Sequence, residues 1–115
     1  MGKLTTHILD TASGQPAADV GIRLYAVDGE RRLVTDTVSN VDGRTDAPLL
    51  EGGAMRTGTY ELEFDIGDYF ARQGHTVTGP RFFETVILRF AVNGDEDYHV
   101  PLLASPWSYS TYRGS

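Results

Sequence analysis

Short runs of alternating apolar and polar residues, separated by turn-forming residues, constrain the fold of this chain most strongly. The clearest run is 59–66, in which the apolar residues of one face alternate with acidic residues: Tyr60, Leu62, Phe64 and Ile66 with Glu61, Glu63 and Asp65. Other strand-like runs lie at 4–9, 20–27, 32–38, 98–103 and 107–112, and 86–92 is a hydrophobic strand-like run. Residues 68–73, followed by Gly74, are the one segment with a helical pattern. Many short strands and one brief helix predict an all-β fold of the sandwich type.

Pairs of turn residues predict how consecutive strands are joined. Asp28-Gly29 and Asn93-Gly94 each predict a tight hairpin, because both positions of such a turn favour residues that adopt positive φ. Asp42-Gly43 predicts a further tight turn, directly before Arg44. Residues 47–57 are expected to form a loop. Pro101 predicts an edge strand or a bulge at 98–103, since proline has no N–H to give to a sheet.

Composition and charge exclude several classes of function. A chain of 115 residues is expected to form a single domain, 1–115. It contains no cysteine, which excludes disulfides, thiolate metal sites and a cysteine nucleophile. The formal net charge of -6 argues against a nucleic-acid partner, because phosphate binding needs a basic surface. No apolar run approaches the length of a membrane span, and neither an apolar leader nor a Ser-Lys-Leu end is visible. We therefore expect no membrane partner and a cytoplasmic location.

Three side chains are candidates for chemistry, although for each one alone the simpler interpretation is a solvated surface residue. His7 and His99 alternate with core-type residues in their strands, so both are expected on the outward face. Histidine titrates near neutral pH and can take up or deliver a proton. Arg44 could bind an anionic or carbonyl-rich ligand through two hydrogen bonds. His75 is expected in a loop without a function, and the histidines lack the spacing of a metal site.

The carboxyl-terminal segment is rich in groups that bind ligands. Chain ends usually fray unless other parts of the protein hold them. Residues 99–115 instead contain two strand-like runs with Ser105-Pro106 between them. The segment finishes with Tyr112, Arg113, Gly114 and Ser115. Aromatic, hydroxyl and guanidinium groups at this end predict that it is part of a working surface.

Four blocks of the sequence, in order, resemble the transthyretin-like family. They are residues 4–10 with 14–17, 40–44, 58–74 and 98–115. The terminal Tyr-Arg-Gly-Ser is the signature of the hydrolase branch of that family, and the thyroid-hormone carriers lack it. The resemblance implies a transthyretin-like two-sheet β-sandwich with antiparallel or mixed pairing and one short helix. It also implies self-association as a homotetramer, with the sites at the dimer–dimer interface.

The activity implied by the resemblance is hydrolysis of 5-hydroxyisourate to 2-oxo-4-hydroxy-4-carboxy-5-ureidoimidazoline, a step of urate degradation. The implied reaction needs no cofactor and no metal ion. The catalytic residues of the family match His7, Arg44 and His99, and its substrate-binding terminal group matches Tyr112, Arg113, Gly114 and Ser115. The alternatives are a non-catalytic transthyretin-like carrier of a small ligand and a β-sandwich interaction module.

Overall fold

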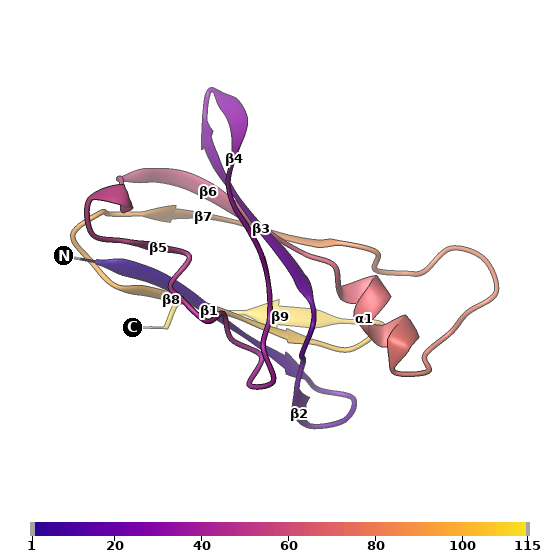
Figure 1. Ribbon diagram of the computed structural model, residues 1–115. Helices are drawn as coiled ribbons and strands as arrows, with labels where there is room; N and C mark the ends of the chain where they lie inside the picture. Colours follow the sequence, from indigo (N-terminus) through magenta and orange to yellow (C-terminus); the bar gives the residue numbers. More distant parts are fainter. Residues whose placement is uncertain (1, 115) are drawn as a thin grey trace.

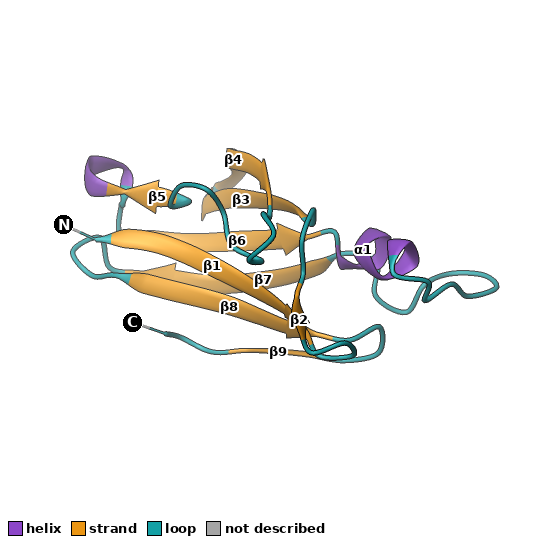
Figure 2. Cartoon of the chain, turned by 60° about the horizontal axis from the view of Figure 1, so that its bottom comes forward, coloured by secondary structure: helices purple, strands orange, loops and turns teal. Residues whose placement is uncertain are grey.

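Two β-sheets packed face to face form the body of the molecule in the computed structural model, which describes residues 2–114 (Figure 1, Figure 2). The first sheet has the strand order β2-β1-β8-β9, and β5 also pairs with β1. Its strands are β1 Lys3–Asp10, β2 Gln15–Pro16, β5 Leu50–Glu51, β8 Tyr98–Ala104 and β9 Tyr109–Thr111. The second sheet, of order β4-β3-β6-β7, consists of β3 Gly21–Asp28, β4 Glu30–Val38, β6 Gly58–Phe64 and β7 Val86–Val92. Strands β1 and β8 are parallel, whereas β3, for example, is antiparallel to both of its neighbours. The predicted all-β sandwich with mixed pairing is confirmed.

The core lies between the two sheets, because alternate residues of the long strands point inward. Leu4 and Ile8 of β1, Leu24 of β3, and Leu62 and Phe64 of β6 expose none of their surface. Removing such apolar side chains from water is the main force that holds the two sheets together. The inward face predicted for the run 59–66 is therefore correct as far as the end of β6.

The helix α1, Ile66–Arg72, closes one end of the sandwich and is tied to β1 by a buried hydrogen bond (Figure 1). Tyr69 O–H donates to Asp10 Oδ2 at 2.8 Å, and the N–H groups of Ala12 and Ser13 donate to Oδ1 at 2.9 and 3.1 Å. Burial alone would raise the pKa of Asp10, but these hydrogen bonds outweigh it and hold the pKa below its ordinary value. Burial, together with the bond to Asp10, raises the pKa of Tyr69 to about 12.

The prediction of a hairpin at Asn93-Gly94 is wrong. β7 pairs with β6 in the second sheet, whereas β8 belongs to the first sheet, so these two residues carry the chain from one sheet to the other. Glycine is required here for a different reason: a Cβ on Gly94 would lie 2.2 Å from the carbonyl oxygen of Met55. The hairpin at Asp28-Gly29 is confirmed between β3 and β4, with Gly29 at a φ of 108°.

Several segment boundaries differ from the sequence prediction. Residues 47–57 contain the strand β5, which pairs with β1, and a short 3-10 helix, Gly52–Ala54, rather than a plain loop. The run 107–112 is a strand only over β9. Ile66, expected at the end of a strand, begins α1, and Gly74 follows the helix as expected with a φ of 92°. Neither helix in residues 2–114 is long and apolar enough to cross a membrane.

Pro101 lies in a central strand and not at an edge as predicted, since β8 has β1 on one side and β9 on the other. His99 N–H donates to the carbonyl oxygen of Gly114, and the Pro101 carbonyl accepts from Thr111 Oγ1, so alternate backbone groups of β8 face the terminal segment. The absent N–H of Pro101 faces the stretch between Thr111 and Gly114, where β9 has already ended. The proline is therefore tolerated because it interrupts the sheet at a point where the neighbouring strand stops.

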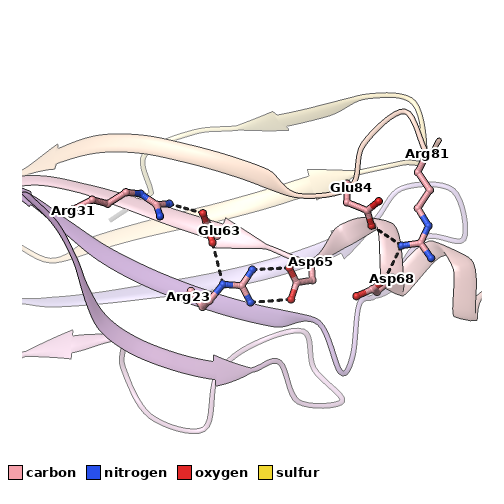
Figure 3. A network of polar contacts seen from close by, with 7 residues as sticks. All are labelled: Arg23, Arg31, Glu63, Asp65, Asp68, Arg81 and Glu84. Carbon is pink, nitrogen blue, oxygen red and sulfur yellow. Dashed lines mark hydrogen bonds and ion pairs between the residues drawn. The ribbon is translucent and has the colours of Figure 1, made fainter.

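Paired charges cover the outer face of the second sheet (Figure 3). Arg23 binds Asp65 through two hydrogen bonds of 2.9 and 2.7 Å and binds Glu63 through a third of 3.0 Å. Arg31 on the next strand contacts both Glu61 and Glu63. The acidic residues of the run 59–66 thus form a cross-strand ion-pair network. The Arg23 and Glu63 side chains are only 26% and 13% exposed, and the pairs join β3, β4 and β6, so we assign the network a structural role.

Candidate active site

His7 and His99 come from neighbouring parallel strands and lie on the same outward face of the first sheet. In the register of β1 and β8, Thr5 pairs with His99 and His7 pairs with Pro101. The two imidazole centroids are 6.5 Å apart and the ring planes are inclined by 36°. The residues on either side of each histidine are buried, so the strand alternation holds both rings outside the core, as predicted.

A tight turn brings Arg44 beside His7, with which it forms an antiparallel bridge. The side chain of Asn40 holds the turn, because its Oδ1 accepts from the N–H groups of Asp42 at 2.9 Å and of Arg44 at 3.2 Å. The backbone closes the same turn, since Asn40 N–H donates to the Arg44 carbonyl at 2.7 Å. Arg44 therefore reaches the histidine pair from a loop that lies far from both strands in the sequence.

Gly43 is the residue that permits this turn to lie against β1. Its φ of 74° is in the left-handed region that favours glycine. Ile8 N–H donates to the Gly43 carbonyl at 2.8 Å, so the two backbones are in direct contact. A Cβ on Gly43 would lie 2.4 Å from the Ile8 carbonyl oxygen and 3.3 Å from His7 Cδ2. Any larger residue would push the loop, and with it the arginine that follows, away from the histidine.

The terminal segment runs along β8 and reaches His99. Leu103 pairs with Ser110 in the register of β8 and β9. Further along, Gly114 N–H donates to the His99 carbonyl at 2.7 Å, and His99 N–H donates back to the Gly114 carbonyl at 3.3 Å. A Cβ on Gly114 would lie 3.1 Å from both Cβ and Cδ2 of His99. The glycine thus lets the terminal segment approach the imidazole closely.

The other members of the predicted substrate-binding group are Tyr112, Arg113 and Ser115. Tyr112 is 59% exposed. The Arg113 guanidinium donates to Glu96 Oε1 at 2.9 Å and lies 4.4 Å from the centroid of the Tyr98 ring, so it is engaged within the chain. Ser115 lies outside the described residues. The roles of these three residues as substrate contacts stay predictions.

Both histidines are held in the neutral form more strongly than free histidine. Burial lowers the pKa of His7, and the positive charge of Arg44 lowers it further, while the backbone and the charge of Asp42 act in the opposite direction. Burial also lowers the pKa of His99, with further contributions from Arg44 and His7. A neutral imidazole carries one nitrogen that donates and one that accepts. The pair can therefore both accept and supply a proton at neutral pH.

A cavity of about 460 Å³ opens beside Arg44 and His99, and His7 is not among the residues that line it. Small-molecule sites in proteins measure roughly 300–1,000 Å³, so a ligand of modest size would fit. Thr5 and His99 line it from the paired strands, and Arg44 and Asp46 line it from the loop. Within residues 2–114, no group of three or more His, Asp or Glu side chains could hold a metal ion. His75 lies elsewhere, with its ring 5.6 Å from that of Phe70.

The model of the HIUase/Transthyretin family matches residues 4–114. The chain belongs to this family. A 5-hydroxyisourate hydrolase of Ralstonia nicotianae is 53% identical over 117 residues, which cover 100% of both chains. The structure of Klebsiella pneumoniae 5-hydroxyisourate hydrolase is 33% identical with a TM-score of 0.81, again over 100% of both chains. The crystal structure of (S)-allantoin synthase is 47% identical with a TM-score of 0.93, over 99% of this chain and 44% of that one. The resemblance identified from the sequence is thus confirmed.

Sequence reasoning missed two residues that organise this candidate site, Thr5 and Asn40. Thr5 Oγ1 lies 2.9 Å from His99 Nδ1. Alternation places Thr5 on the same face as His7, but its partner depends on the register between β1 and β8, which no local pattern specifies. For Asn40 a local signal exists, because asparagine before a turn commonly binds the backbone two residues further on.

Proposed function

We propose that this protein hydrolyses 5-hydroxyisourate to 2-oxo-4-hydroxy-4-carboxy-5-ureidoimidazoline in the degradation of urate. The identity to curated hydrolases over the full length of the chain supports this function. The observation that carries it is the convergence of two neutral imidazoles and one guanidinium on a single outward wall. These groups suit amide hydrolysis, because the attacking water must lose a proton, the carbonyl oxygen becomes negative and the leaving nitrogen needs a proton.

In the proposed reaction, water attacks a ring carbonyl of the substrate. A new C–O bond forms while one imidazole accepts the proton of the water, and the adjacent amide C–N bond then breaks as the leaving nitrogen receives a proton. His7 and His99 share these two proton transfers. Arg44 binds the carbonyl oxygen and stabilises the negative charge that develops on it, as a fixed cation next to a partly buried site can do. The terminal segment contributes hydrogen-bonding groups through Tyr112 and Ser115.

We also propose that the active form is a homotetramer with its sites at the dimer–dimer interface. Two observations support association. A groove of about 430 Å³ runs between β7 and β9, lined by Ile87, Phe90, Tyr109 and Tyr112. Ile87, Tyr109 and Tyr112 are 47%, 41% and 59% exposed, and exposed apolar side chains beside edge strands are a surface on which another chain can pack. Native mass spectrometry at micromolar protein would detect four chains, and a monomeric active species would contradict the proposal.

The cytoplasmic location remains a prediction that cell fractionation would test.

A coupled assay tests the activity. Urate oxidase acting on urate generates the unstable intermediate in place, and its absorbance decay is followed with and without this protein. The decay should accelerate in proportion to protein concentration. His7→Ala and His99→Ala should each lower kcat by about 10²–10⁴-fold. His75→Ala is the matched control, because it removes the remaining histidine, which lies away from the cavity. Saturable binding of the intermediate without faster decay would indicate the alternative, a small-ligand carrier.

A further inference from the structure

The imidazole of His99 is held from two sides. On one side, Nδ1 lies 2.9 Å from Thr5 Oγ1 on the neighbouring strand. On the other side, Cδ2 faces Gly114, at the point where a Cβ would come within 3.1 Å. Nδ1 and Cδ2 are the two ring atoms bonded to Cγ, so Nε2 and Cε1 form the free tip of the ring. The nitrogen left to meet a substrate is therefore Nε2.

Thr5 differs from other threonines of this sheet in its hydrogen-bond partner. Thr6, Thr11 and Thr111 donate their hydroxyl protons to the backbone carbonyls of Val100, Ala104 and Pro101. Thr5 instead binds a side-chain nitrogen of a residue that it meets directly in the β1–β8 register. A backbone bond of the first kind stabilises the sheet, whereas a bond to Nδ1 selects the orientation and the tautomer of an imidazole.

We propose that Thr5 is a positioning residue that fixes His99 in one orientation and one tautomer, with Nε2 directed to the reacting atoms. The proposal rests on the proposed function of His99. Threonine suits this task because its branched Cβ restricts χ1 and thereby the direction of the hydroxyl. The direction of the bond corresponds to one tautomer in each case: Nδ1–H donating to the hydroxyl leaves Nε2 free to accept a proton, and a hydroxyl donating to Nδ1 leaves the proton on Nε2.

Substitutions at Thr5 separate positioning from packing. Thr5→Val keeps the branched shape and removes the hydroxyl, whereas Thr5→Ser keeps the hydroxyl. We expect Thr5→Val to lower kcat about 10-fold with KM changed less than about 2-fold, the size expected for loss of one oriented hydrogen bond in the transition state. Thr5→Ser should restore most of the activity. Thr35→Val on β4 is the matched control, because it removes a part-buried hydroxyl that binds the Leu49 carbonyl.

Nitrogen NMR of the histidine rings gives a readout independent of turnover. In protein labelled with ¹⁵N-histidine, the signals of His99 are assigned from their loss in His99→Ala. The wild-type protein should show one neutral tautomer of His99, and Thr5→Val should show a mixture of both. An unchanged tautomer together with unchanged kcat in a folded Thr5→Val protein would overturn the proposal. If Thr5→Val does not fold, Thr5→Ala is measured in the same way. If the wild-type protein does not hydrolyse the substrate, the proposed function fails, while the tautomer measurement still tests the role of Thr5.

Discussion

The backbone of His7 pairs with that of Arg44, and this bridge places a guanidinium next to two imidazoles whose pKa values it lowers. The pairing depends on a loop and not on the sheet, so the electrostatics of the site can be altered without altering either histidine. The effect of the guanidinium on the two imidazoles can therefore be measured by substituting Arg44 alone.

Replacing Arg44 by methionine should lower kcat by about 10²–10³-fold, because the developing negative charge on the substrate loses its cationic partner. The same change should raise the pKa of both His7 and His99, since the charge of Arg44 lowers both in the native protein. Histidine NMR titration measures the second effect. Arg44→Lys retains the positive charge and should leave the two pKa values closer to those of the native protein. Unchanged titration in Arg44→Met would contradict the assigned electrostatic coupling.

The pH dependence of kcat/KM follows from the same shifts. At least one imidazole must be neutral to accept a proton from water, and the pKa of each lies below the ordinary value of 6.5. The neutral form therefore predominates above 6.5 and is lost as the pH falls through the lowered value. We expect the acid limb of the profile to have its midpoint below 6.5, measured by initial rates with freshly generated substrate. A midpoint above 6.5 would show that the histidines are stabilised as cations.

Alanine substitutions at Gly43 and Gly14 separate the cost of a left-handed backbone conformation from the cost of a steric clash. Both have φ near +75°, at 74° and 76°, but a Cβ on Gly14 would meet nothing within 4 Å. Gly14→Ala should therefore lower the free energy of unfolding by about 1–2 kcal/mol, the effect of the left-handed backbone alone. Gly43→Ala should lower it by a further 1–3 kcal/mol, roughly, because its Cβ meets the Ile8 carbonyl. Urea denaturation compares the two variants. Only Gly43→Ala should also lower kcat, since it displaces Arg44.

Gly114→Ala should affect activity more than stability. The added methyl group must be accommodated by a shift of the His99 ring or of the terminal segment, because only 3.1 Å separates the Cβ position from His99 Cδ2. We expect a loss of kcat of about 10-fold with a thermal midpoint within a few degrees of the native value. Gly53→Ala is the control, since a Cβ there would meet nothing within 4 Å. Equal activity of the two variants would show that the terminal approach to His99 is unimportant.

Tyr69→Phe tests the buried bond to Asp10 through the pH dependence of stability. The pKa of Asp10 lies below its ordinary value of 3.8, so the charged carboxylate stabilises the fold above that pH and loses this effect as the pH falls through the lowered pKa. Without the Tyr69 hydroxyl we expect about 1–3 kcal/mol less stability at pH 7. The difference between native and variant proteins should shrink in acid, and urea titrations at neutral and acidic pH measure it. A difference that is constant with pH would contradict this coupling.

Local patterns identified most strands, because the alternation in β6 and β3 directly reflects one buried and one exposed face. They failed where the outcome depended on which sheet a strand joins. Asn93-Gly94 has the composition of a hairpin but links two sheets, and Pro101 looked like an edge residue although its strand is central. The outward positions of His7 and His99 followed from alternation, whereas their proximity to each other and to Arg44 required the register of β1 with β8 and the turn after Asn40.

The order of strands along the chain also determines when the site can form. The strands of the second sheet all lie within residues 21–92, an interval that also contains β5 of the first sheet, so they are present before β8 has been synthesised. The first sheet cannot be completed in that interval, because β1 can pair with β2 and β5 but its parallel partner β8 lies at residues 98–104. Pairing between segments so distant in sequence is intrinsically slow. We therefore expect the ion-paired sheet to act as a template during translation, and catalytic competence to be the last property that the folding chain acquires.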